Sequence, residues 1–588
     1  MSSVRSFLKS TSGLATIVFF FTILFLHLIW GNSSPLAWDV MGYHVYFVQA
    51  VIHGDQTISS LEFYEHIQQT YQNTETLYQF IQTPDGNFIS KYSSGWAVLN
   101  APFLIVGHWI SGWTGQAQDG FSRPYQIAAT TGSLFYTLLG LIYMRKVLLQ
   151  LFSERLTIVL MAVLVFATNY LHMNYGSTSM SHILIFPFYA ILINATLKFH
   201  SAPSIKYSLI IGWSLGIMML IRPTEIIAAA IPLLFGVTSI KAFILRIKQV
   251  FTTKHYYIAI IVTGLVYSVQ LLFWKSTTGE FLFYTYLNPG EGLDLATPYL
   301  KEFLLSYRKG WFVYTPVMLL ALVGLIRIWK KFPQLALGVV LFFVLNIYLL
   351  SSWTTWWYAA SFSQRALVQS YPIALLLIGA AIQDLNKPFR YTMCGIITLC
   401  ACLNLFQTWQ YQNGIIHMDR MTKSYYFSVF GQTSAPTAEQ SELLLIDHGK
   451  SIFDDIQNYQ LIRTVKVDDG YPKWLTKENP YSGLKQIPFD SISTNDHVWI
   501  IAKVATPYYS PDSINLLTCF SMKYNDEDYF WRAGASRGID QYQDSVYFSY
   551  LTPHLRTRED KLTGLIWLEK GDSVLINGFE FDIWEKKN

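Results

Sequence analysis

The side chains best suited to chemistry are a few ionisable groups in the apolar first two-thirds of the chain. Asp39 lies just beyond the first apolar run and shortly before Tyr43. A carboxylate at the edge of a membrane has one dry side and one wet side, so its pKa can be tuned for a general base. The alternative is that Asp39 caps the helix that follows it, because Asp is a favoured N-cap residue. Both interpretations stay open.

Further candidates lie at the ends of later apolar runs. His182 is near a polar turn, where a histidine is more often an interfacial side chain than a catalyst. Arg222 ends an apolar run, and an ionisable residue at that depth is a functional candidate, although snorkelling to headgroups would also explain it. Arg308 and Arg365 are expected on the same face as Arg222. Because guanidinium groups suit phosphate oxygens, the three arginines favour a site for a lipid phosphate.

Aromatic residues accompany these charges. Tyr92 precedes a long apolar run, and Trp356 lies in a Trp-rich loop ahead of Arg365. Belts of Trp and Tyr are normal at membrane interfaces, so the aromatic residues alone prove little. Together with the arginines, however, they could cover a lipid-linked substrate. The predicted substrate-binding residues are Tyr43, Tyr92, Arg222, Arg308, Trp356 and Arg365.

The composition identifies the kind of chain that must position these residues. Of its 588 residues, 52% are hydrophobic and only 14% are charged, whereas soluble domains carry about 25% charged residues. The sequence therefore predicts a polytopic α-helical membrane protein. The net charge of +4 is mostly the bias of loops that stay inside, so nothing favours a nucleic-acid partner. The four cysteines do not form a disulfide framework.

Basic clusters alternate with aromatic-rich loops between the apolar runs, which predicts the topology. Positive loops stay in the cytoplasm, and a span needs about 20 apolar residues. We expect eleven crossings plus interfacial helices, with the N-terminus inside and the C-terminus outside. The expected crossings are 12–31, 125–144, 156–174, 181–197, 206–221, 224–239, 256–274, 311–328, 334–351, 366–384 and 391–410. The run Gly95–Trp113 is predicted not to cross, because a crossing there would move every later basic loop outside.

The composition changes after residue 411. Residues 412–588 are rich in charged and turn residues, and short alternating runs predict strands at 497–504, 514–521, 545–551, 563–568 and 574–584. We therefore expect a transmembrane domain over 1–411 and an external, all-β, jelly-roll-like domain over 412–588. Its ending resembles carbohydrate-binding or galactose-binding modules in pattern. Either this domain props the membrane part, or it binds a sugar or polymer.

The order of features along residues 10–411 resembles the integral-membrane GT-C glycosyltransferases, including the mannosyl- and aminoarabinosyl-transferase branch. The features are the loop with Asp39, "YSSGW", the "RP" at Arg222, "RKGWFVYTP" and the late "SFSQR". The resemblance implies a polyprenyl-phosphate sugar donor, an acceptor glycan, lipid or protein, and Asp39 as the base. Relatives often place a second acid in the next external turn, where this chain has His182 or Ser181. Glu291 and Asp294 are the reserve acids.

The resemblance also bears on metals. Relatives that use lipid diphosphates commonly hold a divalent metal with an acidic pair, but no second acid stands near Asp39 before Asp55. A monophosphate donor and no metal or other cofactor are therefore expected. The expected activity is an inverting transfer of sugar at the external face of a bacterial inner membrane. The alternatives are a transporter or flippase of a lipid-linked substrate, and a non-catalytic envelope component.

Overall fold

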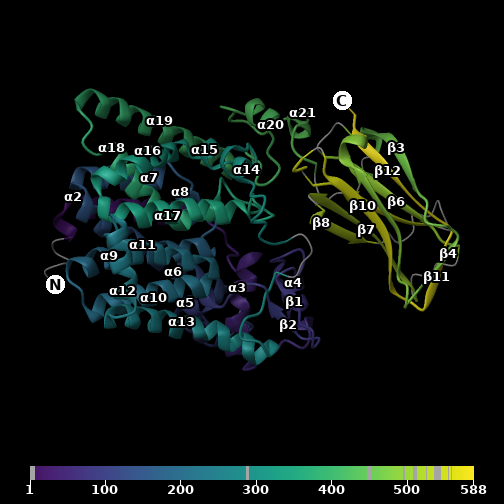
Figure 1. Cartoon of the computed structure of the whole chain (residues 1–588), viewed down its shortest axis with the longest axis horizontal. Coiled ribbons are helices and arrows are strands. Elements are labelled where there is room, and N and C mark those ends of the chain that lie inside the picture. Colours follow the sequence, from purple (N-terminus) through teal and green to yellow (C-terminus); the bar gives the residue numbers. More distant parts are fainter. Residues whose placement is uncertain are drawn as a thin grey trace. The chain divides into compact units, whose positions relative to one another are not determined.

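A computed structural model gives the architecture. It describes residues 7–286, 291–446, 452–454, 456–493, 497–507, 513–524, 526–534, 545–553, 555–557 and 559–587. The described residues form two compact units (Figure 1). The helical unit extends to Leu445 without Glu291 and Gly292, and the β unit contains these two residues and those from Ile446 onward. The division falls later than residue 411, because Ile415 and Tyr425 after the last long helix pack with Tyr314 and Phe362 of the helical unit.

Seven of the described helices are long and apolar enough to cross a membrane. They are α2 (Thr11–Trp30), α6 (Arg123–Leu151), α9 (Ser181–Ser201), α13 (Lys254–Thr278), α17 (Pro333–Ser351), Arg365–Ile382 and α19 (Lys387–Gln412). The sixth consists of the 3-10 segment η4 (Arg365–Ser370) and α18 (Tyr371–Ile382). Such helices satisfy their own backbone groups, as a lipid environment requires. The chain is thus a multi-pass helical membrane protein.

The other helices of this unit, apart from those between α2 and α5, are not among these seven. They are α5 (Gly95–Trp113), α7 (Glu154–Phe166), α8 (Tyr170–Tyr175), α10 (Ile205–Ile221), η2 (Pro223–Ala229), α11 (Ala230–Leu234), α12 (Ile240–Val250), α14 (Leu300–Leu305), α15 (Trp311–Tyr314), η3 (Pro316–Met318), α16 (Leu319–Lys331), α20 (Lys423–Ser428) and α21 (Ala438–Glu442). The expected crossing 311–328 is interrupted at Pro316, since proline cannot continue a helix. The count of eleven crossings stays a prediction.

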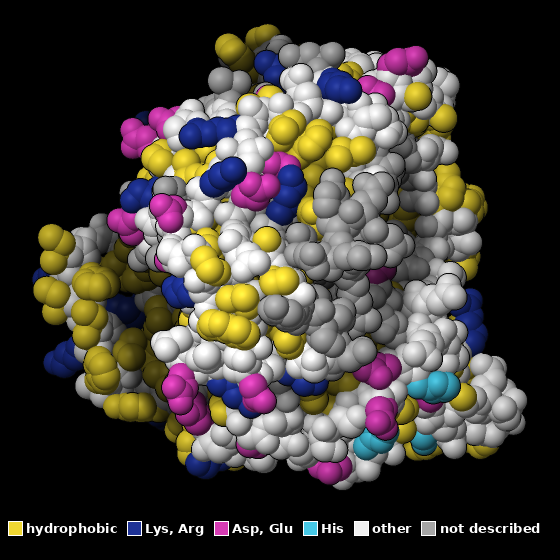
Figure 2. Space-filling model, turned by 90° about the vertical axis from the view of Figure 1, so that its right-hand side faces the viewer, with side chains coloured by type: hydrophobic (Ala, Val, Ile, Leu, Met, Phe, Trp, Pro, Cys, Tyr) yellow, Lys and Arg dark blue, Asp and Glu magenta, His cyan; other side chains and the backbone are white. Residues whose placement is uncertain are grey.

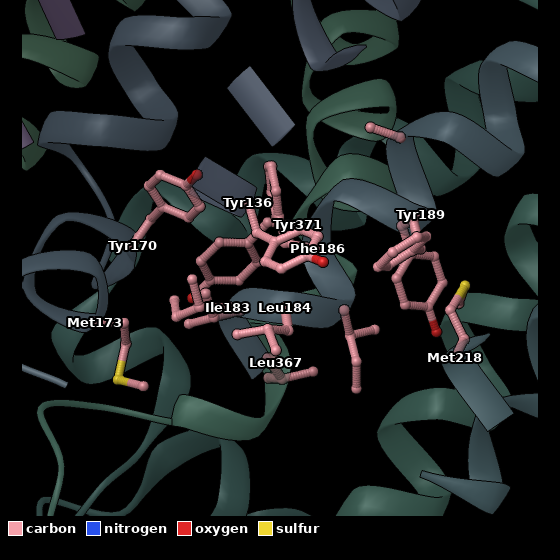
Figure 3. Close-up of a cluster of buried hydrophobic side chains, with 14 of the residues drawn as sticks. Tyr136, Tyr170, Met173, Ile183, Leu184, Phe186, Tyr189, Met218, Leu367 and Tyr371 are labelled. Atoms are coloured by element: carbon pink, nitrogen blue, oxygen red, sulfur yellow. The ribbon is translucent and has the colours of Figure 1, made fainter. Parts of the chain in front are cut away.

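Helix α9 lies at the centre of the helical unit. Figure 3 shows Ile183, Leu184, Phe186 and Tyr189 of α9 packed among side chains from other helices. Close backbone approach supports this packing elsewhere: a Cβ at Gly324 of α16 would lie 2.1 Å from the carbonyl oxygen of Leu377 on α18. Small residues allow such contacts between membrane helices. The helices of this unit are therefore closely packed, around α9 and between α16 and α18.

The segment Gly95–Trp113 forms the continuous helix α5, with Pro102 inside it. It packs along the first part of α6: Gly107 lies beside Ala128, and the hydroxyl of Tyr136 donates to the carbonyl of Leu99 over 2.8 Å. The helix therefore runs antiparallel to α6 and accompanies only part of its length. Its predicted failure to cross the membrane remains a prediction.

The chain between α2 and α5 folds into a small cap. It contains α3 (Asp39–Phe47), the π-helical turn η1 (Val48–His53), α4 (Glu62–Tyr71) and the antiparallel strands β1 (Phe80–Gln82) and β2 (Phe88–Ser90). Figure 1 shows these elements together at one end of the helical unit. His44 of α3 is fully buried and its Nε2 lies 2.8 Å from the carbonyl oxygen of Gly120. That contact fixes α3, and with it Asp39.

The β unit is a sandwich of antiparallel sheets, as the strand pattern predicts. One sheet has the order β5-β10-β7-β8, the other β3-β12-β6-β9, and β4 pairs with β11. The strands are β3 (Tyr459–Val467), β4 (Lys473–Thr476), β5 (Tyr481–Pro488), β6 (Trp499–Ala505), β7 (Asn515–Tyr524), β8 (Glu527–Gly534), β9 (Ser545–Leu551), β10 (Lys561–Lys570), β11 (Ser573–Ile576) and β12 (Gly578–Lys586). The expected strand 574–584 is thus two strands.

Core residues from both sheets meet inside the sandwich. Phe520 and Ile566 of one sheet and Ile500 and Phe581 of the other are fully buried in one cluster. Each such side chain stabilises the fold by about 1.5–3 kcal/mol when it leaves water. On the face shown in Figure 2, Lys and Arg side chains are interspersed with Asp and Glu. Charges of both signs are therefore mixed on that face.

Candidate active site

Asp39 is the centre of a polar cluster in the helical unit. Its Oδ2 accepts from Nη2 of Arg365 over 2.8 Å, and its Oδ1 accepts from the hydroxyls of Tyr78 and Tyr92, each over 2.7 Å. The Asp39 and Arg365 side chains are only 17% and 14% exposed. Among the described residues, no backbone amide of α3 donates to this carboxylate. Asp39 therefore binds side chains from distant segments, and it does not cap α3.

The surroundings of Asp39 keep it ionised. Burial raises the pKa of the carboxyl, but the guanidinium of Arg365 and the hydrogen bonds from Tyr92 and Tyr78 outweigh burial, and Lys91 adds to them. The pKa of Asp39 therefore lies below its ordinary value. Burial and the charge of Asp39 also raise the pKa of Tyr92 and of Tyr78. Both phenols consequently remain protonated donors.

Lys91 places a second cation near this carboxylate. The side chain is buried, and its Nζ lies 4.8 Å from the ring centre of Tyr78, 5.6 Å from that of Tyr92 and 6.0 Å from that of Tyr286. Aromatic faces attract cations at these distances. The lysine and the aromatic rings together line one side of Asp39.

Arg222 provides a third cation, on the side of Tyr43. The Tyr43 ring packs against that of Tyr92 at 4.6 Å, and its hydroxyl accepts from Oγ of Ser181 over 3.3 Å. Burial and Asp39 raise the pKa of Tyr43, while Arg222 opposes them, which places the guanidinium within electrostatic reach of this phenol. In the part of the chain that the structure describes, no group forms a hydrogen bond or ion pair with the Arg222 guanidinium. It is available to an anionic ligand.

His182 is fully buried in the first turn of α9, close to these charges. Its Nδ1 lies 2.9 Å from Oε1 of Gln369. The amide of Gln369 in turn contacts Glu225. Arg222 and Arg365 both act on His182 electrostatically. The structure therefore gathers Asp39, Tyr43, Tyr92, His182, Arg222 and Arg365 from the predicted site residues.

Arg308 and Trp356 have other surroundings. The Nη2 of Arg308 lies 3.1 Å from Oδ2 of Asp419, its Nε donates to the carbonyl of the same residue over 2.9 Å, and the guanidinium lies 3.8 Å from the ring centre of Trp357. Its donors thus already have partners. The ring of Trp356 is buried against Trp357 and Tyr299. None of these contacts of Arg308 and Trp356 involves the carboxylate of Asp39.

Of the two reserve acids, Asp294 has contacts that are described outside the cluster around Asp39. Asp294 closes a local turn, because its carboxylate accepts from the amide and hydroxyl of Thr297 over 3.0 and 2.7 Å. Its own amide donates to the carbonyl of Ser352 over 2.7 Å. Glu291 groups with the β unit. Among the described residues, no three His, Cys, Asp or Glu side chains form a group that could hold a metal ion; a metal-independent reaction stays a prediction.

Several members of the cluster were not predicted from the sequence as binding or catalytic residues. Tyr78 and Lys91 belong to the segment that forms the β1–β2 hairpin and its exit. Lys91 directly precedes the predicted binding residue Tyr92, whereas nothing in the residue pattern sets Tyr78 apart. Glu225 follows Arg222 by three residues, a spacing that could have suggested it. Gln369 is a neutral residue in an apolar run and gave no signal.

Comparison with known proteins gives remote matches among solved structures, and no protein-family profile or curated protein matches the chain. ArnT from Cupriavidus metallidurans bound to undecaprenyl phosphate aligns with 13% identity and a TM-score of 0.41, over 67% of this chain and 64% of its own. The oligosaccharyltransferase AglB from Archaeoglobus fulgidus, in complex with an inhibitory peptide and a dolichol-phosphate, aligns with 11% identity and a TM-score of 0.39, over 75% and 60%.

The arabinosyltransferase EmbB from Mycobacterium smegmatis aligns with 10% identity and a TM-score of 0.31, over 93% of this chain and 64% of its own. The chain therefore spans a little under two thirds of the length of each of these proteins. AglB and EmbB are named as sugar transferases, the class that the sequence resembles. The similarities are remote, so the character of the site rests on its own side chains.

Proposed function

We propose that this protein is a membrane glycosyltransferase that moves a sugar from a polyprenyl-phosphate donor to an acceptor on the external face. The observation that carries the proposal is the ionised Asp39 held between Arg365 and two tyrosines, with the guanidinium of Arg222 nearby. The carboxylate can accept a proton, and the guanidinium groups beside it can contact a phosphate.

In the proposed reaction, a hydroxyl or amine of the acceptor attacks the anomeric carbon opposite the phosphate. The bond between this carbon and the phosphate oxygen breaks, and the electron pair leaves with the polyprenyl phosphate. Asp39 takes the acceptor's proton. Arg222 and Arg365 stabilise the charge on the leaving phosphate. The configuration at the anomeric carbon is inverted. The balance needs no oxidant, reductant or nucleotide.

The test is a transfer assay in proteoliposomes with a panel of polyprenyl-phosphate-linked sugars. Asp39→Asn should reduce transfer by a factor of roughly 10² to 10⁴, the usual contribution of a general base. Asp55→Asn is the matched control, because Asp55 is an exposed acid of the same segment. A transporter of the same lipid would move it across the bilayer without transferring the sugar. Full transfer activity of Asp39→Asn would show that Asp39 is not the base.

A cleft in the β unit favours a second activity, the binding of a saccharide. Its volume is about 700 Å³, and Trp567, Glu569 and Asp572 are among the residues that line it. The ring of Trp567 stacks with that of Tyr481 on the neighbouring strand, at 6.1 Å and 26°. Lys477 and Lys570 line the cleft as well. An aromatic face bordered by charged side chains of both signs suits a sugar ring with its hydroxyls. This unit would then hold a glycan acceptor.

Full-length protein with Trp567→Ala tests this second activity in a binding assay with a panel of glycans. Trp474→Ala is the control, because Trp474 is a 56% exposed tryptophan of the same unit outside the residues that line the cleft. If the wild type and the Trp567 variant bound glycans equally well, the cleft would not be a saccharide-binding site.

A further inference from the structure

Arg222 and Arg365 are carried by two short 3-10 segments. Arg222 immediately precedes η2, and Arg365 is the first residue of η4. One turn further along, η2 presents Glu225 and η4 presents Gln369. Short 3-10 segments have poor internal hydrogen-bond geometry. The separation of the two guanidinium groups therefore depends on what holds these segments together.

The next turn of each segment is joined by a chain of buried hydrogen bonds. The Nε2 of Gln369 donates to Oε1 of Glu225, and the hydroxyl of Tyr189 donates to Oε2 of the same carboxylate. On the other side, Oε1 of Gln369 lies 2.9 Å from Nδ1 of His182, which acts as the donor in this arrangement. The exposed fractions of these four side chains are 0 to 2%.

The frame behind this chain of hydrogen bonds is the packed core. His182 and Tyr189 both belong to α9, and Figure 3 shows Tyr189 and Leu367 of η4 among the buried side chains around that helix. Both oxygens of Glu225 and both polar atoms of Gln369 are used. Arg222 lies within electrostatic reach of Glu225, but burying a carboxylate is still costly, and apolar side chains often stabilise a fold as well as a buried charged group does. A requirement for geometry explains why these polar groups are there.

We propose that Glu225 and Gln369 are positioning residues that set the distance between Arg222 and Arg365, and so the fit of a lipid phosphate between them. The proposal rests on the proposed function. The hydrogen bond between the two side chains links segments that are far apart in the sequence. His182 and Tyr189 anchor that link to α9.

An exchange of the two residues tests this directly. Gln369→Glu places two carboxylates against each other and should weaken binding of undecaprenyl phosphate by roughly tenfold or more, the value of a hydrogen bond to a charged group. The double variant Glu225→Gln/Gln369→Glu reverses the order of donors and acceptors. The new carboxylate at position 369 then accepts from His182 and from the new amide at position 225. The oxygen of that amide accepts from Tyr189, so affinity should return to within about threefold of wild type.

Undecaprenol, which lacks the phosphate, is the control ligand for every variant. Its binding should not change, whereas general damage to the fold would weaken both ligands. Gln369→Met, which has similar length and no hydrogen-bonding amide, replaces Gln369→Glu if the latter does not fold, and should also weaken phosphate binding. Wild-type affinity in Gln369→Glu or Gln369→Met, or a double variant no better than the single one, would overturn the positioning role. If the wild type bound undecaprenyl phosphate no more tightly than undecaprenol, that result would instead overturn the proposed function.

Discussion

Asp39 and Arg365 are separated by 326 positions in the sequence, yet the carboxylate oxygen of one lies 2.8 Å from a guanidinium nitrogen of the other. The contact joins the start of α3 to the start of η4, and it brings the cap between α2 and α5 onto the helical frame. The pair has two consequences. It keeps the carboxylate ionised, and it holds a guanidinium where the leaving phosphate of the proposed reaction would be.

The first prediction separates the three arginines. Lys in place of Arg222 or Arg365 should weaken binding of undecaprenyl phosphate by about tenfold or more, because an ammonium cannot reproduce the two-pronged contact of a guanidinium. Lys in place of Arg308 should leave this affinity near wild type, because Arg308 is engaged by Asp419. Affinity measurements on the purified variants check this. Equal tolerance of Lys at all three positions would exclude the phosphate contact.

A second prediction concerns the Arg308–Asp419 pair itself. Asp419→Asn removes the charge that faces the buried guanidinium, and the free energy of unfolding should fall by about 1–3 kcal/mol. Thermal unfolding in detergent would register this as a lower midpoint, with phosphate binding retained. A lowered affinity at unchanged stability would instead place Arg308 at the ligand.

The third prediction is a pH dependence. Asp39 has a lowered pKa in the folded protein, so it stays ionised as the pH falls below the ordinary pKa of the carboxyl. The stability and the base function that depend on the ionised form are lost only when the pH falls through the lowered pKa. Arg365→Gln removes the first of the influences that oppose burial, so the pKa of Asp39 rises. The acid limb of the rate profile should therefore move to higher pH. An unmoved limb would mean that another group controls the rate.

The tyrosines provide the fourth prediction. Tyr92→Phe and Tyr78→Phe each remove one donor to Oδ1 of Asp39 and should move the same acid limb upward by less than Arg365→Gln does, since each removes a hydrogen bond and no charge. The double variant should move it further than either single one. Tyr71→Phe, which removes the donor to Asp119 over 2.5 Å, is the control and should leave the limb in place.

The fifth prediction concerns topology. In a cysteine-free background, cysteines at the exposed positions Gln116 and Glu478 should react with a membrane-impermeant reagent from outside, and those at Gln150 and Lys330 should not. This is the result expected if α5 does not cross. Labelling of Gln150 and protection of Gln116 would reverse the orientation and move the site around Asp39 to the cytoplasmic face.

The sequence by itself determined the class of chain, its long apolar helices and part of its strands. Apolar runs such as 12–31 and 391–410, and the alternation in 563–568, are local patterns whose physical cause is local, and α2, α19 and β10 follow them. Asp39, Arg222 and Arg365 could be named as candidates for the same reason, because an ionisable residue at the end of an apolar run is unusual wherever the chain folds.

Only the tertiary structure decided which candidates meet. The sequence offered both Arg308 and Arg365 as phosphate partners, but Arg308 pairs with Asp419 and Arg365 with Asp39. Tyr78 and Gln369 carry no local mark of their roles, because a hydrogen bond between distant segments leaves no periodicity in either one. Such pairings depend on how α9, η2, η4 and α3 pack against each other, and packing is a property of the whole helical unit.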